Sequence, residues 1–393
     1  MLLVAHIAAL VWPQAIGFAA ADSYGGPQES AHSSSDGAPA ESNSSKVPTE
    51  IDGEMGAAIY VRTDTDTTTV VSPQVRYRMD IGPDAATIEL GATIDAWSSA
   101  SVDIRTAATP RVRENRVELT ASGSFALPKR RRFGVGYRYS QEPDYLSNAV
   151  NLFVSGESNN RRATITARVF AAFDAIGRSG DKDFFSRAQS VGGFFGWTHV
   201  LSGKSWLTLG NETRATFGFQ SSPYRLVALG GPGPGCAGSV LCIPEIVPRR
   251  RVRNATEARV RFALRPRVSL GATYRFYADS WSLLSHTGAI DLGLNLPQSF
   301  VLAFESRIYK QGPTNFYRAT YPETGNRWAT RDRELSPLLS FRNLVSVSCE
   351  RKKKKLGYAV GVLAGGTYYR YFDFLGLERV FALELGLNTS LLY

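Results

Sequence analysis

The chain ends on Phe381–Tyr393, FALELGLNTSLLY, in which two kinds of side chain alternate. Phe381, Leu383, Leu385 and every second residue onward to Tyr393 are almost wholly apolar, and the residues between them are mostly small or polar. Because successive side chains of a strand point to opposite faces, the stretch predicts a β-strand with one apolar face. A strand of a soluble sandwich is one interpretation. The length of the apolar row and its aromatic end favour a strand of a transmembrane barrel.

The same two-residue period recurs through most of the chain after Glu54, and no segment shows a sustained helical period. Residues 267–279 show it most clearly, with Leu270, Tyr274 and Phe276 on one face and Thr273 and Arg275 on the other. We therefore expect about sixteen strands, an even number as in bacterial single-chain barrels. They are predicted near residues 56–63, 67–80, 86–98, 112–126, 132–141, 148–157, 161–173, 189–201, 205–219, 252–264, 267–281, 283–295, 299–310, 334–349, 355–371 and 378–393.

The connections between these strands fall into two groups by length. One end of the barrel has short turns, such as residues 128–130 and 202–204, and several connections at the other end are long. The long connections are residues 99–111, 174–188, 220–251 and 311–333. Short periplasmic turns alternating with long outer loops are typical of an outer-membrane barrel. The predicted fold class is an all-β transmembrane antiparallel barrel in the bacterial outer membrane.

Composition is consistent with this class and excludes others. The 393 residues are 43% hydrophobic, and the mean hydropathy of −0.16 excludes a bundle of membrane helices. Alternating barrel strands average to neutral hydropathy, so a barrel remains compatible. The net charge is +10 and the sequence pI is about 9.5, which suggests an anionic partner. No nucleic-acid motif accompanies the arginines, so nucleic acid is not an expected partner.

The N-terminal region divides into two segments ahead of the barrel. Residues 1–21 predict a cleaved signal peptide, with an apolar run and small residues before Asp22. Residues 22–54 are rich in Ser, Pro, Gly, Ala and Glu and predict a disordered periplasmic tail, or alternatively a plug inside the barrel. Residues 55–393 form the predicted outer-membrane barrel.

Three cysteines are present, and two of them lie close together in a Gly/Pro-rich loop. Cys236 and Cys242, with five residues between them, can form a local disulfide in an oxidising compartment or remain two thiols. The spacing of the cysteines does not match a zinc or haem motif, and the histidines do not form a ligand set. We therefore expect no metal and no cofactor.

Several short motifs resemble a known family. They are Glu142-Pro-Asp-Tyr145, Ser222-Pro-Tyr-Arg225, Tyr274-Arg-Phe-Tyr277, Asp279-Ser-Trp281, Ser285-His-Thr287, Arg307-Ile-Tyr309 with Gln311, and Asn315-Phe-Tyr317. Spread over residues 85–345, they resemble domain-of-unknown-function family 3570. The resemblance implies an outer-membrane β-barrel-like fold. It implies no activity and no site residues.

The face opposite the apolar rows is rich in arginine and acidic residues and is predicted to line the lumen. The residues assigned to it are Arg76, Arg78, Arg116, Glu118, Arg138, Arg214, Glu257, Arg259, Arg261, Arg275, Glu305 and Arg307. Sixteen-stranded porins enclose an aqueous channel. The leading hypothesis is a non-enzymatic channel or transporter for small polar solutes, with a bias toward anions from the arginine excess. An Arg–Glu lattice that only braces the wall is equally compatible.

Two other functions remain open. The barrel can be a scaffold whose long loops 220–251 and 311–333 bind a surface ligand or partner. A rim hydrolase using residues of the cluster Asp279, Ser282, Ser285 and His286 is the least favoured, because no nucleophile elbow is present. The expected partners are outer-membrane lipid and lipopolysaccharide, small polar solutes, and the barrel-assembly machinery through the C-terminal strand.

Overall fold

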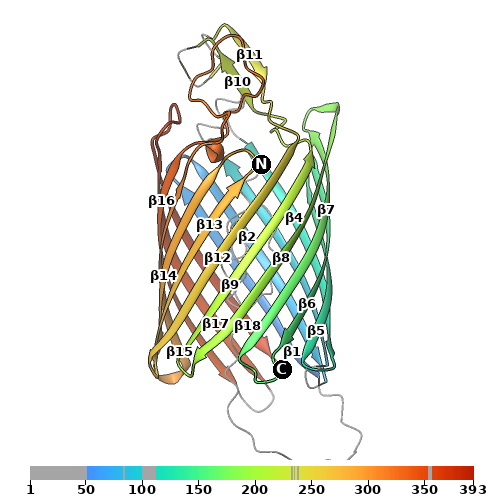
Figure 1. Ribbon diagram of the computed structural model, residues 1–393, viewed down its shortest axis with the longest axis vertical. Helices are drawn as coiled ribbons and strands as arrows, with labels where there is room; N and C mark the ends of the chain where they lie inside the picture. The colour runs from blue at the N-terminus through green and yellow to red at the C-terminus, as the bar shows by residue number, and fades with distance from the viewer. Residues whose placement is uncertain are drawn as a thin grey trace, which may run out of the picture.

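The computed structural model describes residues 51–82, 85–99, 112–231, 233, 235–236, 239–352 and 356–393. Sixteen antiparallel strands close into one barrel, in which β1 pairs with β18 and β9 pairs with β12 (Figure 1). The expected fold class is confirmed. The strands are β1 (Ile51–Asp64), β2 (Thr68–Ile81), β3 (Ala86–Ser99), β4 (Val112–Leu127), β5 (Arg131–Glu142), β6 (Tyr145–Glu157), β7 (Ala163–Arg178), β8 (Asp181–Ser202), β9 (Ser205–Gly218), β12 (Arg250–Arg265), β13 (Val268–Asp279), β14 (Leu284–Asn295), β15 (Phe300–Gln311), β16 (Leu338–Lys352), β17 (Gly357–Tyr371) and β18 (Arg379–Leu392).

The last strand, β18, closes the ring against β1. Arg62 lies opposite Glu384, and the backbone groups of Gly53 and Tyr393 exchange hydrogen bonds of 2.8 and 3.0 Å. Leu383 and Leu385 are 64% and 59% exposed, whereas Glu384 between them is 4% exposed. The alternation that predicted the strand therefore separates an outward apolar face from an inward polar one.

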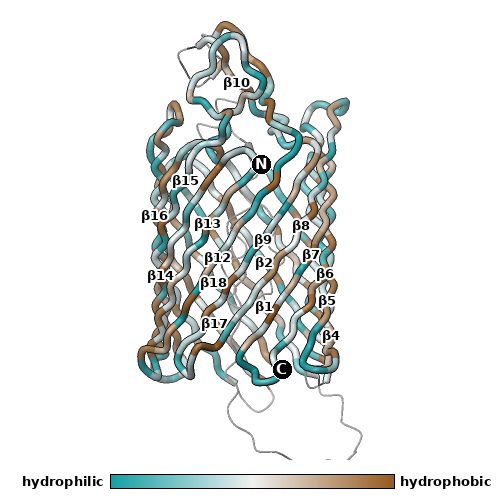
Figure 2. The backbone as a smooth tube through the Cα atoms, in the orientation of Figure 1, coloured by the Kyte–Doolittle hydropathy of each residue, from teal (hydrophilic) through white to brown (hydrophobic). Residues whose placement is uncertain are grey.

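The same separation holds around the barrel. Figure 2 shows hydrophobic and hydrophilic residues alternating along the strands. Outward positions carry exposed apolar residues such as Val135, Val169 and Ile290. A continuous apolar outer face of this kind suits contact with lipid tails. Within the described ranges, no helix is long and apolar enough to span a membrane.

Short turns gather at one end, called here the inner end, where β1 begins and β18 ends (Figure 1). Two residues, Gly203 and Lys204, suffice to join β8 to β9. β1 begins at Ile51, so the barrel includes four residues that the sequence analysis assigned to the tail. The predicted signal peptide and the rest of the tail lie outside the described residues.

The prediction of a long loop at residues 174–188 was wrong. β7 continues to Arg178 and β8 begins at Asp181, joined by Ser179 and Gly180, whose φ of 82° suits glycine. Charged residues such as Lys182 gave the segment the composition of a loop. They are tolerated because this hairpin rises beyond its neighbours at the outer end (Figure 1).

Two of the other long connections, residues 219–249 and 312–337, are confirmed, and both contain ordered structure. Residues 220–249 contain a small hairpin, β10 (Leu226–Leu229) and β11 (Leu241–Pro244), which the sequence analysis did not anticipate. The connection from β15 ends later than expected, because residues Arg333–Leu335 form a 3₁₀ turn and β16 begins only at Leu338. Residues 100–111 lie outside the described part of the chain.

Candidate functional site

The charged residues predicted to line the lumen occupy inward-facing positions of their strands. Cross-strand partners share a face, and Arg275 lies opposite Glu257 while Arg259 lies opposite Thr273. The adjacent positions on these strands carry exposed Phe262 and Phe276, which fixes the outward face. The inward set is Arg76, Arg78, Arg116, Glu118, Arg138, Arg214, Glu257, Arg259, Arg261, Arg275, Glu305 and Arg307.

Most of these charges are neutralised locally on one side of the barrel. We call the inward face of β15–β18 and β1–β4 the paired-charge wall. At its centre, the Arg342 guanidinium lies 2.8 Å from the Glu384 carboxylate and 3.1 Å from that of Glu305. The Thr367 hydroxyl also donates to Glu384 at 2.9 Å. Arg342 and Glu384 have side chains only 4% and 5% exposed, so the pair is removed from bulk water.

The same wall repeats this arrangement on β2–β4. Arg116 binds Asp95 in a bidentate manner, with Nε and Nη2 at 2.9 and 2.6 Å from the same carboxylate oxygen, and the Ser72 hydroxyl donates to the other oxygen. Arg76 lies 2.7 Å from Glu89. Charge-assisted pairs of this kind hold a fixed geometry, and removing one partner leaves an uncompensated buried charge.

Within the wall, Arg78 of β2 also contacts Asp80 at 3.0 Å. Pairing continues past both borders of the wall, where Arg138 of β5 contacts Glu118 at 3.3 Å. On β12–β14, Arg259 lies 3.4 Å from Glu257, and Arg261 pairs with Asp291. The lumen is therefore lined by Arg–carboxylate pairs.

The opposite side of the lumen has a different composition, which the sequence analysis did not identify. We call the inward face of β6–β9 the aromatic wall. Phe153, Phe170 and Phe194 point inward there, and each ring covers a glycine of a neighbouring strand. A Cβ added at Gly134 would collide with the Phe153 ring, and one added at Gly192 would collide with Phe170. The glycines thus make room for rings that lie against the sheet.

Two arginines are associated with these rings. Arg214 lies over the Phe170 ring, with its guanidinium carbon 5.6 Å from the ring centroid. Arg168 lies directly opposite Phe153 on β6 and Phe194 on β8. Among the described residues, Arg168 makes no hydrogen bond, ion pair or ring contact. Glu212 is the acidic residue whose charge acts on Arg168, and it lies beyond ion-pair distance.

Arg307, on β15, also makes no hydrogen bond or ion pair with a described residue. Its surroundings differ from those of Arg168, since it lies opposite Arg342 and Ala289. The charge of Glu305 acts on it only at longer range. The two arginines thus leave positive charge in the lumen on two different walls.

The outer mouth carries a folded unit built from two long loops. We call residues 219–249 and 312–337 the cap, which stands above the barrel in Figure 1. Isolated β-bridges join the two loops at Leu229 with Tyr321 and at Ile246 with Ala329. Buried Glu245 of the first loop accepts a hydrogen bond of 2.5 Å from Thr330 of the second. The two loops therefore form one structure.

An apolar cluster attaches the cap to the barrel mouth. Phe316 and Leu335 of the cap lie in one buried cluster with the inward-facing Tyr277, Tyr309 and Tyr371 of the strands. Burial of aromatic side chains is a large stabilising contribution, because each removes much apolar area from water. The cap is consequently fixed to the inside of the rim on the side of β13–β17.

Polar contacts extend the cap to other parts of the rim. Arg333 binds Asp66 of the β1–β2 turn at 2.9 Å. The Tyr224 hydroxyl donates to Asp144 of the β5–β6 turn and accepts from the Ser179 N–H of the β7–β8 turn at 2.6 Å. The cap therefore reaches both the paired-charge wall and the aromatic wall.

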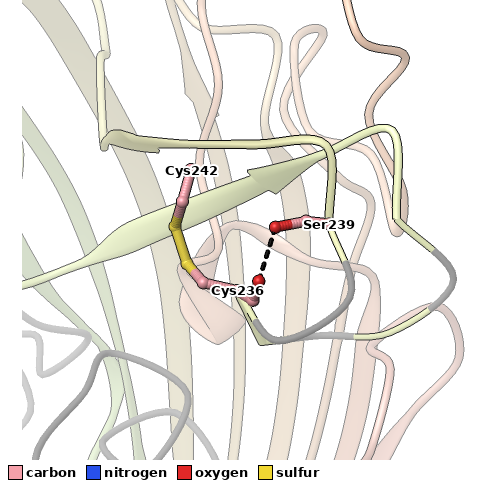
Figure 3. Close-up of a disulfide and its surroundings, with 3 residues drawn as sticks. All are labelled: Cys236, Ser239 and Cys242. Carbon is pink, nitrogen blue, oxygen red and sulfur yellow. Dashed lines mark hydrogen bonds between the residues drawn. A yellow bond between two sulfur atoms is a disulfide. The ribbon is translucent and has the colours of Figure 1, made fainter.

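Cys236 and Cys242 are joined in a disulfide within the cap (Figure 3). Cys242 belongs to β11, and the Ser239 hydroxyl donates to the Cys236 carbonyl at 2.6 Å. The bond closes the tip of the β10–β11 connection. Cys349 is a free thiol on β16.

The residues of the suggested rim hydrolase do not converge. Ser285 is 1% exposed on the inward face of β14, whereas the adjacent His286 faces outward and contacts the Tyr274 hydroxyl at 2.7 Å through Nδ1. Asp279 instead binds Arg251 at 2.5 Å and caps its own turn. Neighbours in a strand point to opposite faces, so this Ser and His cannot act together.

Three carboxylates gather at the outer end of β4 and β5, between the two walls. Oxygen atoms of Glu114, Glu142 and Asp144 lie within 4.8 Å of one another. Asp144 is also the acceptor of the Tyr224 hydrogen bond. Acidic groups alone do not define a metal site, and we assign none here.

Fold and lumen together define the class of protein: a large antiparallel barrel of the outer-membrane type, with a polar interior and a capped mouth. The chain belongs to the family described as Protein of unknown function (DUF3570), whose model matches residues 33–190 and 186–341. No curated protein sequence matches it.

Solved structures with similar folds are barrels of the outer membrane. A bacterial polysaccharide outer membrane secretin aligns with a TM-score of 0.50 and 8% identity over 86% of this chain and 97% of that one. The siderophore receptor PirA from Pseudomonas aeruginosa gives a TM-score of 0.44 and 11% identity over 87% of this chain. This chain spans 62% of that receptor. The monoaromatic hydrocarbon channel TodX, as a deltaS2 mutant, gives 0.41 and 9% identity over 88% of this chain and 90% of that one. Such low identities show the fold alone.

Proposed function

We propose that this protein is a channel of the bacterial outer membrane that passes small polar solutes and favours anions. The observation that carries the proposal is the polar inward face of a sixteen-strand barrel. A barrel of this width is too large to be filled by its own side chains, and porins of this size leave water inside. Charged rows facing such a lumen contact water or one another.

Anion preference follows from local charge. Arg–carboxylate pairs such as Arg116 with Asp95 contribute little net field, because each arginine is neutralised by its partner. Arg168 and Arg307 lack such a partner among the described residues and leave positive potential in the lumen. Pore-lining arginines without counter-ions attract anions and repel cations.

The cap belongs to the same proposal as the element that sets access at the outer mouth. Its contacts to Asp66 on one side and Asp144 on the other place it above both walls. Solute reaching the lumen from outside passes this folded unit. The cap then determines which solutes enter, and the lumen determines which of them cross.

Localisation and partners are part of the proposal. The outward apolar face contacts outer-membrane lipid, and the exposed arginines of the outer loops contact lipopolysaccharide phosphates. The barrel-assembly machinery inserts the chain through β18, whose apolar row and terminal Tyr393 are exposed outward.

The test is conductance of the purified full chain in planar bilayers under a salt gradient. Discrete channels with a reversal potential on the anion side support the proposal. Arg168→Gln combined with Arg307→Gln reduces the anion preference, whereas Arg259→Gln combined with Glu257→Gln, which removes both partners of a pair, leaves it near the wild-type value. Silent bilayers with correctly folded protein contradict it.

A second function, a surface or partner-binding scaffold, is favoured by one observation. The cap is an ordered unit closed by a disulfide, and Val240 and Leu241 at its tip are 62% and 49% exposed. Replacing residues 222–247 by a short Gly-Ser linker separates the two functions. Conductance persists if the barrel is the channel, and binding of a surface partner is lost if the cap is the working part.

No enzymatic step is proposed. Ser285 and His286 lie on opposite faces of β14, so the residues that suggested a hydrolase offer no nucleophile with its base.

A further inference from the structure

We infer that the aromatic wall holds a binding site for organic anions that carry a planar apolar ring, the class of aromatic carboxylates, centred on Arg168 between Phe153 and Phe194. This deepens the proposed channel function and rests on it, because the ligand must enter the lumen. Nothing in the family description or the fold assigns a ligand to this wall.

The register places the three side chains in one row. On β7, Arg168 has Phe153 as its direct partner on β6 and Phe194 as its direct partner on β8. Directly opposed side chains have Cβ atoms about 4.5–5.5 Å apart. The Phe153 ring leans toward Gly134 of β5 and the Phe194 ring toward Gly210 of β9. The two phenyl rings therefore lie on either side of the Arg168 position without contacting its guanidinium.

The rings are held in place by the glycines beneath them. An added Cβ at Gly134 would collide with the ring of Phe153, and added Cβ atoms at Gly196 and Gly210 would lie 3.0 and 3.2 Å from the ring of Phe194. The Phe153 ring therefore rests on bare backbone of β5, and the Phe194 ring on bare backbone of its own strand and of β9. Such seating holds each ring in place before a ligand arrives.

The charge of Arg168 is available to a ligand. Glu212 on β9 is the acidic residue that acts on it, but Phe194 lies between them in the register, opposite Arg168 on one side and Glu212 on the other. No described residue forms an ion pair or hydrogen bond with Arg168. The ring thereby separates Arg168 from the kind of neutralisation that Arg342 and Arg116 have on the paired-charge wall.

These groups fit one chemistry. A guanidinium presents parallel N–H donors that match a carboxylate in a bidentate arrangement. Phenyl rings prefer offset or edge-to-face contact with another aromatic ring. A benzoate-like anion satisfies both at once, whereas acetate satisfies only the charge and benzyl alcohol only the rings.

Arg307 provides a matched control inside the same lumen. It also lacks an ion-pair partner among the described residues, but its direct cross-strand partners are Ala289 and Arg342 rather than phenylalanines. A general preference for anions depends on both arginines. Recognition of the ring depends on Arg168 alone.

The experiment measures equilibrium binding of benzoate, acetate and benzyl alcohol to the full chain in detergent by calorimetry. Proteins compared are wild type, Arg168→Gln, Phe194→Leu and Arg307→Gln, each checked for strand content by circular dichroism. We expect wild type to bind benzoate roughly tenfold or more tightly than either analogue. Arg168→Gln and Phe194→Leu each lose most of that difference, and Arg307→Gln keeps it.

The inference is overturned if wild type binds benzoate no better than acetate, or if Arg307→Gln loses as much as Arg168→Gln. A Phe194→Leu protein that fails to fold is replaced by Phe153→Leu, which removes the ring on the other side. Binding is measured without a membrane, so its result is independent of conductance. If benzoate binds selectively but bilayers stay silent, the proposed channel function is contradicted and the binding site is supported. If the protein conducts anions but binds benzoate no better than acetate, the channel function is supported and the binding site is contradicted.

Discussion

The two walls of the lumen use the same residue, arginine, in opposite ways. On the paired-charge wall, Arg342 and Arg116 each contact carboxylates within 3.1 Å and are almost fully buried. On the aromatic wall, Arg168 is half-buried between the Phe153 and Phe194 positions of the neighbouring strands and has no such contact with a described residue. The first arrangement stabilises the barrel, and the second leaves a charge available. An inward-facing arginine is therefore evidence of a binding group only when its cross-strand neighbours are known.

The largest expected effect comes from breaking the paired-charge wall. Arg342→Met leaves the carboxylates of Glu384 and Glu305 without their shared guanidinium, and we expect a loss of about 3–5 kcal/mol in the free energy of unfolding. Urea titration of the protein in lipid vesicles measures it. Adding Glu384→Gln to Arg342→Met should recover a large part of the loss. A single variant as stable as wild type contradicts a structural role for this wall.

The aromatic wall should respond to a change in its backbone spacing. Gly192→Ala places a methyl group against the Phe170 ring and 2.6 Å from the Thr213 carbonyl oxygen, so the ring and the neighbouring strand must move. We expect a cost of about 1–3 kcal/mol in the same titration. Gly203→Ala, at an open turn with nothing within 4 Å, is the control and should be near neutral.

The cap is attached by different contacts above the two walls. Removing one of its contacts on the aromatic side is expected to have a smaller effect on stability than the changes above. On the aromatic side the Tyr224 hydroxyl supplies hydrogen bonds to Asp144 and Ser179. Tyr224→Phe removes about 1 kcal/mol of attachment, which corresponds to roughly fivefold faster proteolysis within the cap. The lumenal selectivity of the barrel should not change. Unchanged proteolysis shows that this contact does not hold the cap.

The smallest expected effect is a pH dependence on the other side of the cap. Burial, with a further contribution from the Asp332 charge, raises the pKa of Glu334 to about 7 from an ordinary 4.5. An acid with a raised pKa stabilises the folded form at low pH and loses that contribution as pH rises between these two values. Protection factors for amide hydrogen exchange in residues 330–337, which already account for the intrinsic pH dependence of exchange, should therefore fall from pH 5 to pH 7. Glu334→Gln should remove this trend, and a trend that survives in that variant excludes Glu334 as its cause.

The sequence predicted the strands well because their signal is local. A two-residue period fixes which residues share a face, and this was sufficient to place Arg275 and Glu305 on the inward side. The predicted strand ends were wrong where composition and structure disagree. In the β7–β8 hairpin, charged residues give the segment the composition of a loop although it is paired as strands.

The pairing inside the lumen could not be predicted, because it depends on register between strands. Arg342 and Glu384 are 42 residues apart, and neither position identifies the other in the sequence. The aromatic wall was missed for the same reason. Phe153 and Phe170 read as ordinary strand residues until the glycine under each ring is known. The cap likewise depends on two loops that meet only in space, at Glu245 and Thr330.

The most direct test of the central claim is single-channel recording with the full chain in a planar bilayer under a KCl gradient. The account predicts discrete conductance steps with a reversal potential on the chloride side. Arg168→Glu and Arg307→Glu should each move that potential toward potassium. Benzoate bound at Arg168 should block the chloride current of wild type and of Arg307→Glu, but not that of Arg168→Glu. Folded protein that inserts without conducting, or that conducts with no change in either variant, contradicts it.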